Sequence, residues 1–190
     1  MNIDIIESLA IKLPQFIVDG SGLVLENNIE TDDDIEEGFL LENIRHSQIN
    51  YIPASSYFPK PERKKELSKG HSGKDVYPRD EKRSINALKK ADYQCEFDQS
   101  HETFIRKKDG HPYTEPHHII PLCRYNDFLY DLDVEANIVS LCSNCHNLVH
   151  YGIEYQEMLR KLYEQRKELL VKAGLDISFA KLKEYYEITL

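Results

Sequence analysis

Four histidines in the second half of the chain have types and spacing suited to metal-assisted hydrolysis. His117 and His118 are neighbours, and His146 and His150 lie four residues apart. Residues four apart on a helix share one face, so the second pair can present two imidazoles to one ion. Phosphodiester hydrolysis needs a cation to neutralise charge on the phosphate and a base with a pKa of about 7 to activate water. Histidine can meet both needs, and the combination of the two pairs indicates such a site.

A second candidate metal site is built from thiols. Cys142 and Cys145 form a C-x2-C knuckle directly before His146, and Cys95 supplies a third thiolate. Adjacent helical residues differ by about 100° in direction, so Cys145 and His146 can face different ions. Cys123 has no partner at knuckle spacing, and we expect it to be a buried or free thiol. The knuckle predicts a structural zinc ion.

The fourth ligand of this zinc is open between two residues. Asp98 and His101 both follow Cys95 closely. Imidazole is a commoner zinc partner than carboxylate beside thiolates, which favours His101. The expected ligands are Cys95, His101, Cys142 and Cys145, with Asp98 as the alternative fourth ligand.

The pattern of apolar and turn-forming residues predicts the elements that must position these side chains. Two short strands are expected at about residues 113–122 and 137–141, followed by a helix from about Ser143 to His150. Further helices are expected at residues 80–91 with Asp80 as the N-terminal cap, at 154–172 with Gly174 as a stop, and from 176 or 178 to 186. Neighbours on an ideal strand point to opposite faces, so we expect the first strand to distort near His118.

Residues 115–122, Asn137 and residues 141–150 together resemble the HNH family of nucleases, and the match covers about residues 93–152. The resemblance implies an α+β fold with a ββα-metal (His-Me) finger core and a structural zinc knuckle, flanked by helices and preceded by an acidic N-terminal segment. In the family a second cysteine usually stands where this chain has Asp98. That departure leaves the fourth zinc ligand open.

The same resemblance implies a role for each residue of the first site. His118 corresponds to the general base that deprotonates water, and His117 to the first ligand of the catalytic ion. Asn137 corresponds to the asparagine that orients the base by bonding backbone near it. His146 corresponds to the second ligand, and His150 to the third histidine of colicin-type members, which other members lack. The implied cofactors are Mg²⁺, or Mn²⁺, Ni²⁺ or Zn²⁺, at the catalytic site and structural Zn²⁺ at the thiols.

Charge is distributed unevenly along the chain. The net charge is −9, and residues 1–50 contain eleven acids and two bases, which leaves 22 acids and 22 bases in the rest. Residues 60–90 hold eleven bases against five acids, so this stretch can track phosphates. The alternative is a solvated, flexible basic linker. The expected nucleic-acid contacts are Lys82, Arg83, Lys89 and Lys90.

Composition predicts three parts: an acidic segment of unknown role at residues 1–52, a basic linker containing Pro and Gly at 53–79, and an HNH nuclease domain with C-terminal helices at 80–190. The acidic segment can pack on the core, dock a protein partner or shield the DNA face. No apolar run approaches the ~20 residues of a membrane span, and residues 1–10 do not have the pattern of a secretory signal. We therefore expect a cytoplasmic protein with reduced thiols and no membrane partner.

The expected activity is metal-dependent hydrolysis of DNA in restriction, phage defence or a mobile element. Aromatic residues near the basic stretch are too sparse to indicate stacking on single strands, so the expected partner is duplex DNA. Two alternatives stay open. One is a non-catalytic zinc module that binds nucleic acid or protein, and the other is a colicin-type RNase or toxin.

Overall fold

The computed structural model describes residues 16–19, 22–25, 38–44, 57–70, 73 and 75–188. The chain divides into two units, Met1–Thr31 and Asp32–Leu190. In the first unit, β1 (Phe16–Asp19) pairs with β2 (Gly22–Leu25) in antiparallel register. The acid run at residues 32–37, on which the predicted shielding or docking role depends, lies outside the described residues. The predicted division at residues 52 and 79 stays a prediction.

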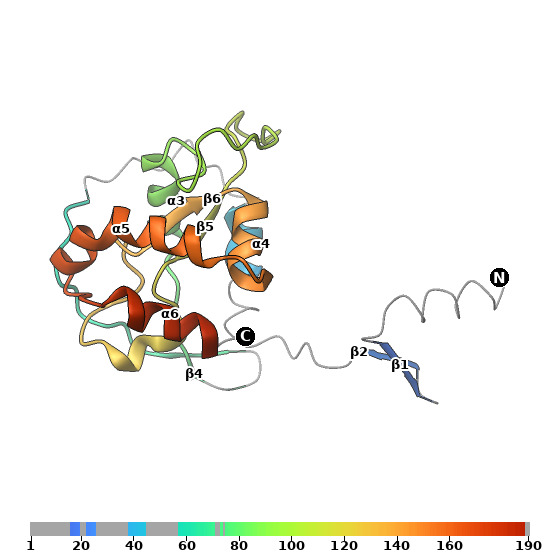
Figure 1. Cartoon of the computed structure of the whole chain (residues 1–190), viewed down its shortest axis with the longest axis horizontal. Coiled ribbons are helices and arrows are strands. Elements are labelled where there is room, and N and C mark those ends of the chain that lie inside the picture. The colour runs from blue at the N-terminus through green and yellow to red at the C-terminus, as the bar shows by residue number, and fades with distance from the viewer. Residues whose placement is uncertain are drawn as a thin grey trace. The chain divides into compact units, whose positions relative to one another are not determined.

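The second unit is a mixed α+β structure with short two-stranded sheets (Figure 1). Residues 38–44 are helical. The elements that follow are β3 (Ser68–Lys69), β4 (Asp75–Val76), α3 (Glu81–Lys90), β5 (Glu115–His118), the 3₁₀ helix η2 (Leu122–Asp127), β6 (Ile138–Leu141), α4 (Ser143–Tyr151), α5 (Gln156–Lys172) and α6 (Phe179–Ile188). Helices α3 and α4 both contact the β5–β6 pair, and α5 contacts α6. No helix in the described part of the chain is long and apolar enough to cross a membrane.

Local chemistry explains where these helices begin and end. Asp80 caps α3, because its carboxylate accepts a hydrogen bond from the backbone N–H of Lys82 at 3.0 Å. Gly174 has a φ of +78° just after α5, a backbone conformation that residues other than glycine rarely adopt. Both signals were predicted from the sequence and are confirmed.

The β5–β6 pair is shorter and more regular than expected. His117 pairs with Val139 and His118 with Ile138, so the ladder continues through both histidines. The chain bends only afterwards, at Ile119 and Ile120. The distortion expected near His118 thus follows this residue and does not fall within the pair, so the two side chains keep the alternation of a regular strand and reach different partners.

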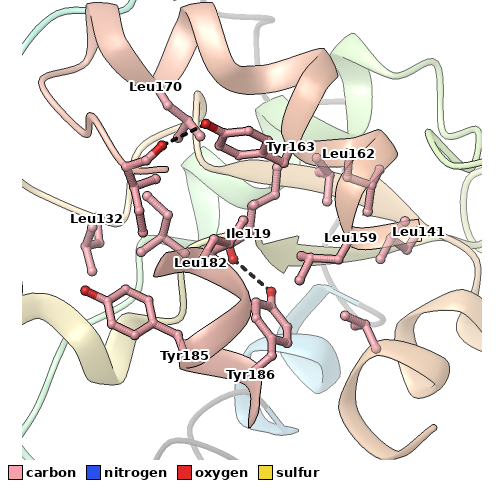
Figure 2. Close-up of a cluster of buried hydrophobic side chains, with 14 of the residues drawn as sticks. Ile119, Leu132, Leu141, Leu159, Leu162, Tyr163, Leu170, Leu182, Tyr185 and Tyr186 are labelled. Atoms are coloured by element: carbon pink, nitrogen blue, oxygen red, sulfur yellow. Dashed lines mark hydrogen bonds between the residues drawn. The ribbon is translucent and has the colours of Figure 1, made fainter. Parts of the chain in front are cut away.

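A hydrophobic core joins the strands to the two C-terminal helices (Figure 2). Ile119, Leu132 and Leu141 pack there with Leu159 and Leu162 of α5, and all five are buried. Burial of one such side chain contributes about 1.5–3 kcal/mol. Two tyrosine hydroxyls in this layer donate to backbone carbonyls: Tyr163 to Ile177 and Tyr186 to Ile119, each at 2.8 Å.

Part of the stretch predicted to be a linker contributes to this unit. Tyr77 is 2% exposed and belongs to the main core. Its hydroxyl accepts a hydrogen bond from the Lys65 backbone N–H at 3.0 Å and donates to Asp131 at 2.9 Å. Residues 57–70 and 75–78 thus supply contacts that bear on the candidate site.

Candidate active site and metal centres

Three of the four predicted site histidines form one cluster. His117 on β5 and His146 and His150 on α4 each offer a ligand atom, and these atoms lie within 4.8 Å of one another. The ring centroids are 5.4 Å apart for His117 and His146, 4.9 Å for His117 and His150, and 4.7 Å for His146 and His150. Strand β5 contacts α4, and the four-residue spacing on α4 puts its two rings on the face turned to the strand.

Tyr186 determines which nitrogen of His117 is available to an ion. Its hydroxyl donates to the Ile119 carbonyl at 2.8 Å, so at 2.9 Å from His117 Nε2 it accepts the ring N–H. This contact fixes the tautomer of His117 with the proton on Nε2. The lone pair then belongs to Nδ1, which is buried.

Glu115 has the same effect on His146. Its Oε2 lies 3.0 Å from His146 Nδ1, and its Oε1 accepts the Ser143 hydroxyl at 2.9 Å. Burial raises the pKa of Glu115, but the hydrogen bond and charge of His146 outweigh it and leave the pKa lowered. An ionised Glu115 keeps the proton on Nδ1 of His146 and leaves Nε2 for an ion. Glu115 is buried beside the histidine and is not a solvated surface carboxylate.

His118 lies outside the three-histidine cluster and contacts a carboxylate. Its Nε2 is 2.8 Å from Oδ1 of Asp133, and both side chains are buried. Burial raises the pKa of Asp133, but the hydrogen bond and charge of His118, with the charge of Lys65, lower it to about 2. Asp133 is therefore ionised at neutral pH and accepts the Nε2–H of His118, so the lone pair of a neutral His118 is on Nδ1.

Asn137 is fully buried and bonds only to backbone in the described contacts. Its Oδ1 accepts from the Ile120 N–H at 2.8 Å, and its Nδ2 donates to the carbonyls of Ile120 at 3.0 Å and Leu132 at 2.9 Å. Ile120 lies two residues after His118, and Leu132 precedes Asp133. The carboxamide therefore ties together the two segments that carry the histidine and its carboxylate.

The second predicted cluster also assembles. Cys95, His101, Cys142 and Cys145 each offer a ligand atom within 4.8 Å of the others. Nδ1 of His101 is 3.4 Å from the sulfur of Cys145 and 3.6 Å from that of Cys142. Three thiols and one imidazole are a donor set suited to tetrahedral zinc, so this cluster could hold a zinc ion.

Asp98 lies beside the thiol cluster without joining it. It is 3.9 Å from the other ring nitrogen of His101, Nε2, and its Oδ1 accepts from the backbone and the hydroxyl of Ser100. These two hydrogen bonds lower the pKa of Asp98. Cys123 is exposed on η2, outside both clusters. Geometry thus favours His101 over Asp98 as the fourth ligand.

The buried thiols influence one another's ionisation. Burial raises the pKa of Cys95, but backbone hydrogen bonds from Cys142, Asp98 and Phe97 and a hydrogen bond from His101 outweigh it and lower the pKa. Burial and the neighbouring thiols raise the pKa of Cys145. Thiolates are the form that binds metal, so a zinc ion at this cluster would stabilise the deprotonated cysteines.

Two of the four bases expected to contact DNA are paired with carboxylates of the fold. Arg83 bonds to Glu62 at 2.8 Å and to Asp131 at 3.2 Å, and Lys90 bonds to Glu135 at 2.5 Å. Lys82 is exposed and Lys89 is half-buried on α3. Their contact with DNA stays a prediction.

Sequence reasoning missed Asp133 and Tyr186. Asp133 lies in a run of alternating acids, Asp131, Asp133 and Glu135. From the sequence alone this pattern cannot be distinguished from a solvated acidic loop. Tyr186 carries no local signal, because its histidine partner is 69 residues away.

The comparisons with known proteins add one sequence relative. Over 55 residues the chain is 42% identical to the type IV methyl-directed restriction enzyme EcoKMcrA of Escherichia coli (strain K12). Part of this chain is similar to a restriction enzyme. The match covers 29% of this chain and 18% of that enzyme, so the chain spans less than a fifth of the relative's length.

A solved structure, the type IV phosphorothioation-dependent restriction endonuclease ScoMcrA, aligns with a TM-score of 0.41 and 22% identity over 77% of this chain and 24% of that one. No family model matches the chain.

Proposed function

We propose that this chain is a metal-dependent HNH endonuclease that hydrolyses phosphodiester bonds of duplex DNA, in restriction or phage defence. The observation that carries the proposal is the pair of adjacent histidines: His117 joins His146 and His150 in a three-imidazole cluster, while His118 is held by a carboxylate. The partial similarity to a type IV methyl-directed restriction enzyme supports the restriction setting. The order β5, β6, α4 supports a core of the ββα-metal type.

In this proposal each residue of the site has a distinct role in hydrolysis. His118 takes a proton from the attacking water through Nδ1, since its Nε2–H is bonded to Asp133. Asn137 holds the backbone around that histidine. His117, His146 and His150 bind a divalent ion, and Tyr186 and Glu115 hold two of these rings in the required tautomer. When bound, the ion supplies positive charge to the scissile phosphate.

The donor set bears on the choice of ion. Mg²⁺ prefers oxygen ligands and octahedral geometry, whereas imidazole nitrogen suits zinc, nickel and other first-row transition metals. Three histidines therefore favour Ni²⁺ or Zn²⁺ over the Mg²⁺ named first from the sequence, and Mn²⁺ is intermediate because it binds imidazole but prefers oxygen ligands. At the thiol cluster we propose structural zinc, held by Cys95, His101, Cys142 and Cys145.

DNA contacts are proposed for α3. Lys82 is exposed and can reach a phosphate, and Lys89 is half-buried nearby on the same helix. Arg83 and Lys90 contribute to the fold, because their charges are already paired with carboxylates. Replacement of Lys82 by alanine is expected to weaken binding and to reduce its salt dependence by about one counterion.

Plasmid cleavage tests the proposal. The full chain is incubated with supercoiled plasmid and with Mg²⁺, Mn²⁺, Ni²⁺ or Zn²⁺, beside His118→Ala and the control His111→Ala, which changes a histidine stacked on Tyr93 outside both clusters. The proposal expects nicking by wild type and by His111→Ala, and a loss of about 10²–10⁴-fold in His118→Ala with unchanged zinc content. Equal nicking by His118→Ala would refute it.

The same assay is extended to an RNA substrate and to a comparison of unmodified plasmid with methylated plasmid. Preferential cleavage of RNA would favour a colicin-type RNase instead. A chain that binds zinc and DNA yet cleaves neither substrate would favour the non-catalytic zinc module.

A further inference from the structure

Asp133 occupies a position that nothing in the sequence pattern assigned. Its side chain is fully buried, and each carboxylate oxygen has its own partners. Oδ1 faces Nε2 of His118 at 2.8 Å. Oδ2 accepts from the backbone N–H of Asp80 at 2.7 Å and forms an ion pair with Lys65. A carboxylate held from both sides in this way has a fixed orientation.

The backbone of Asp133 is held as firmly as its side chain. Its N–H donates to Asp131 at 2.8 Å, and its carbonyl accepts from Arg83. Asp131 in turn accepts from Tyr77, and Arg83 bonds to Glu62. The residues preceding α3 are thus connected through charged contacts to the carboxylate beside His118.

We propose that Asp133 is the positioning residue for His118: it locks the imidazole in the Nε2–H tautomer, so that Nδ1 faces the reaction as the proton acceptor, and Lys65 and Asp80 fix the carboxylate in place. This inference rests on the proposed function for its catalytic consequence. The tautomer itself follows from the contacts alone, because an ionised carboxylate accepts and cannot donate. The lowered pKa of Asp133, about 2, supports its being ionised.

The contacts predict an unusual result for Asp133→Asn. A carboxamide has one acceptor oxygen and one donor nitrogen. The Oδ2 position faces two donors, Asp80 N–H and Lys65 Nζ, so the amide oxygen is expected to take that side. The amide nitrogen then faces His118 Nε2, which must become the acceptor. His118 is forced into the Nδ1–H tautomer, in which Nδ1 can take no proton.

The matched control is Glu135→Gln. Glu135 is also a buried carboxylate paired with a lysine, two residues further along the same loop, and it bonds to Asn86 rather than to His118. Loss of a buried negative charge is common to both variants. Only Asp133→Asn changes the group that faces the histidine.

The experiment has a spectroscopic arm and a kinetic arm, both on the full zinc-loaded chain. The ¹⁵N shifts of the His118 ring at pH 8, assigned by their loss in His118→Ala, report its tautomer. The proposal expects Nε2–H in wild type and in Glu135→Gln, and Nδ1–H in Asp133→Asn. For plasmid nicking it expects a kcat at least 100-fold lower in Asp133→Asn with KM changed less than threefold, and a kcat within about threefold of wild type in Glu135→Gln.

The two arms separate this inference from the proposed function. Wild-type His118 in the Nδ1–H tautomer overturns the inference whether or not the chain nicks DNA, and it needs no variant to fold. A tautomer switch in Asp133→Asn supports positioning by Asp133 even if wild type nicks nothing, in which case the nuclease proposal fails alone. Nicking by wild type with equal kcat in Asp133→Asn overturns the catalytic consequence drawn here.

Discussion

Tyr163 and Tyr186 form a natural pair for testing how the histidine cluster is held. Both hydroxyls are buried and donate to a backbone carbonyl at 2.8 Å (Figure 2). The Tyr186 hydroxyl, in addition, accepts the Nε2–H of His117 at 2.9 Å and lies 3.4 Å from the His118 carbonyl oxygen. Replacement of each tyrosine by phenylalanine removes the hydroxyl and keeps the ring in the core.

The magnitudes follow from the groups that lose a partner. A buried donor or acceptor left unsatisfied costs about 1–3 kcal/mol. Tyr163→Phe affects one carbonyl, so we expect a loss of about 1–3 kcal/mol in the free energy of unfolding. Tyr186→Phe affects the Ile119 carbonyl and the His117 ring N–H, so we expect about 2–4 kcal/mol. Only Tyr186→Phe frees His117 to change tautomer, which should weaken Mn²⁺ or Ni²⁺ binding about 10–100-fold.

Urea unfolding measures the first quantity, and isothermal titration calorimetry with Mn²⁺ or Ni²⁺ on the zinc-loaded chain measures the second. The expected pattern is destabilisation in both variants and weakened binding in Tyr186→Phe alone. Metal affinity that falls equally in the two variants, or in neither, would refute the assignment of Tyr186 to His117.

Two further predictions concern protons and zinc. The folded-state pKa of Asp133 is lowered from 3.8 to about 2, so its ionisation stabilises the fold above pH 4 and this contribution is lost as the pH falls through 2. The free energy of unfolding of wild type relative to Asp133→Asn should therefore drop by about 2 kcal/mol between pH 5 and pH 2. A difference between the two proteins that grows towards acid pH would contradict this prediction. Zinc content measured by mass spectrometry should be lost in His101→Ala and kept in Asp98→Asn, because only the His101 ring lies among the thiols, and the reverse result would make Asp98 the fourth ligand.

The parts of the site that are local in sequence could be predicted. The four-residue step from His146 to His150 and the Cys142–Cys145 knuckle depend on helix geometry alone, and the structure brings each set together as that geometry requires. The cap at Asp80 and the stop at Gly174 are equally local. Ligand chemistry narrowed the candidates for the fourth zinc ligand to Asp98 and His101, and only the fold places one of them, His101, among the thiols.

The parts that depend on long-range packing could not be predicted. Tyr186 reaches His117 from the last helix, and Lys65 reaches Asp133 from a segment that composition indicated as a linker. Arg83 and Lys90 show that bases in such a cluster can already be paired within the fold, since the carboxylates to which they hydrogen-bond are 21 to 48 residues away in sequence. Net charge along the chain contains no information on such pairing.

The alternation of side chains along a strand led to a wrong expectation about how His117 and His118 are arranged. Two neighbouring histidines on a regular strand cannot point to the same place, and a distorted strand was expected to solve that problem. The structure keeps the strand regular and gives each ring a different partner: α4 and α6 for His117, and Asp133 for His118. Because neighbours on a strand point to opposite faces, His117 can serve the three-histidine cluster while His118 contacts Asp133.

Anomalous diffraction from crystals soaked in Mn²⁺ would test most directly whether these histidines hold the ion. We predict a manganese peak bound by Nδ1 of His117, by Nε2 of His146 and by the ring of His150, and no manganese peak among the thiols of Cys95, Cys142 and Cys145. A manganese ion bound elsewhere, with the three rings hydrogen-bonded to one another or to protein groups in its place, would contradict it.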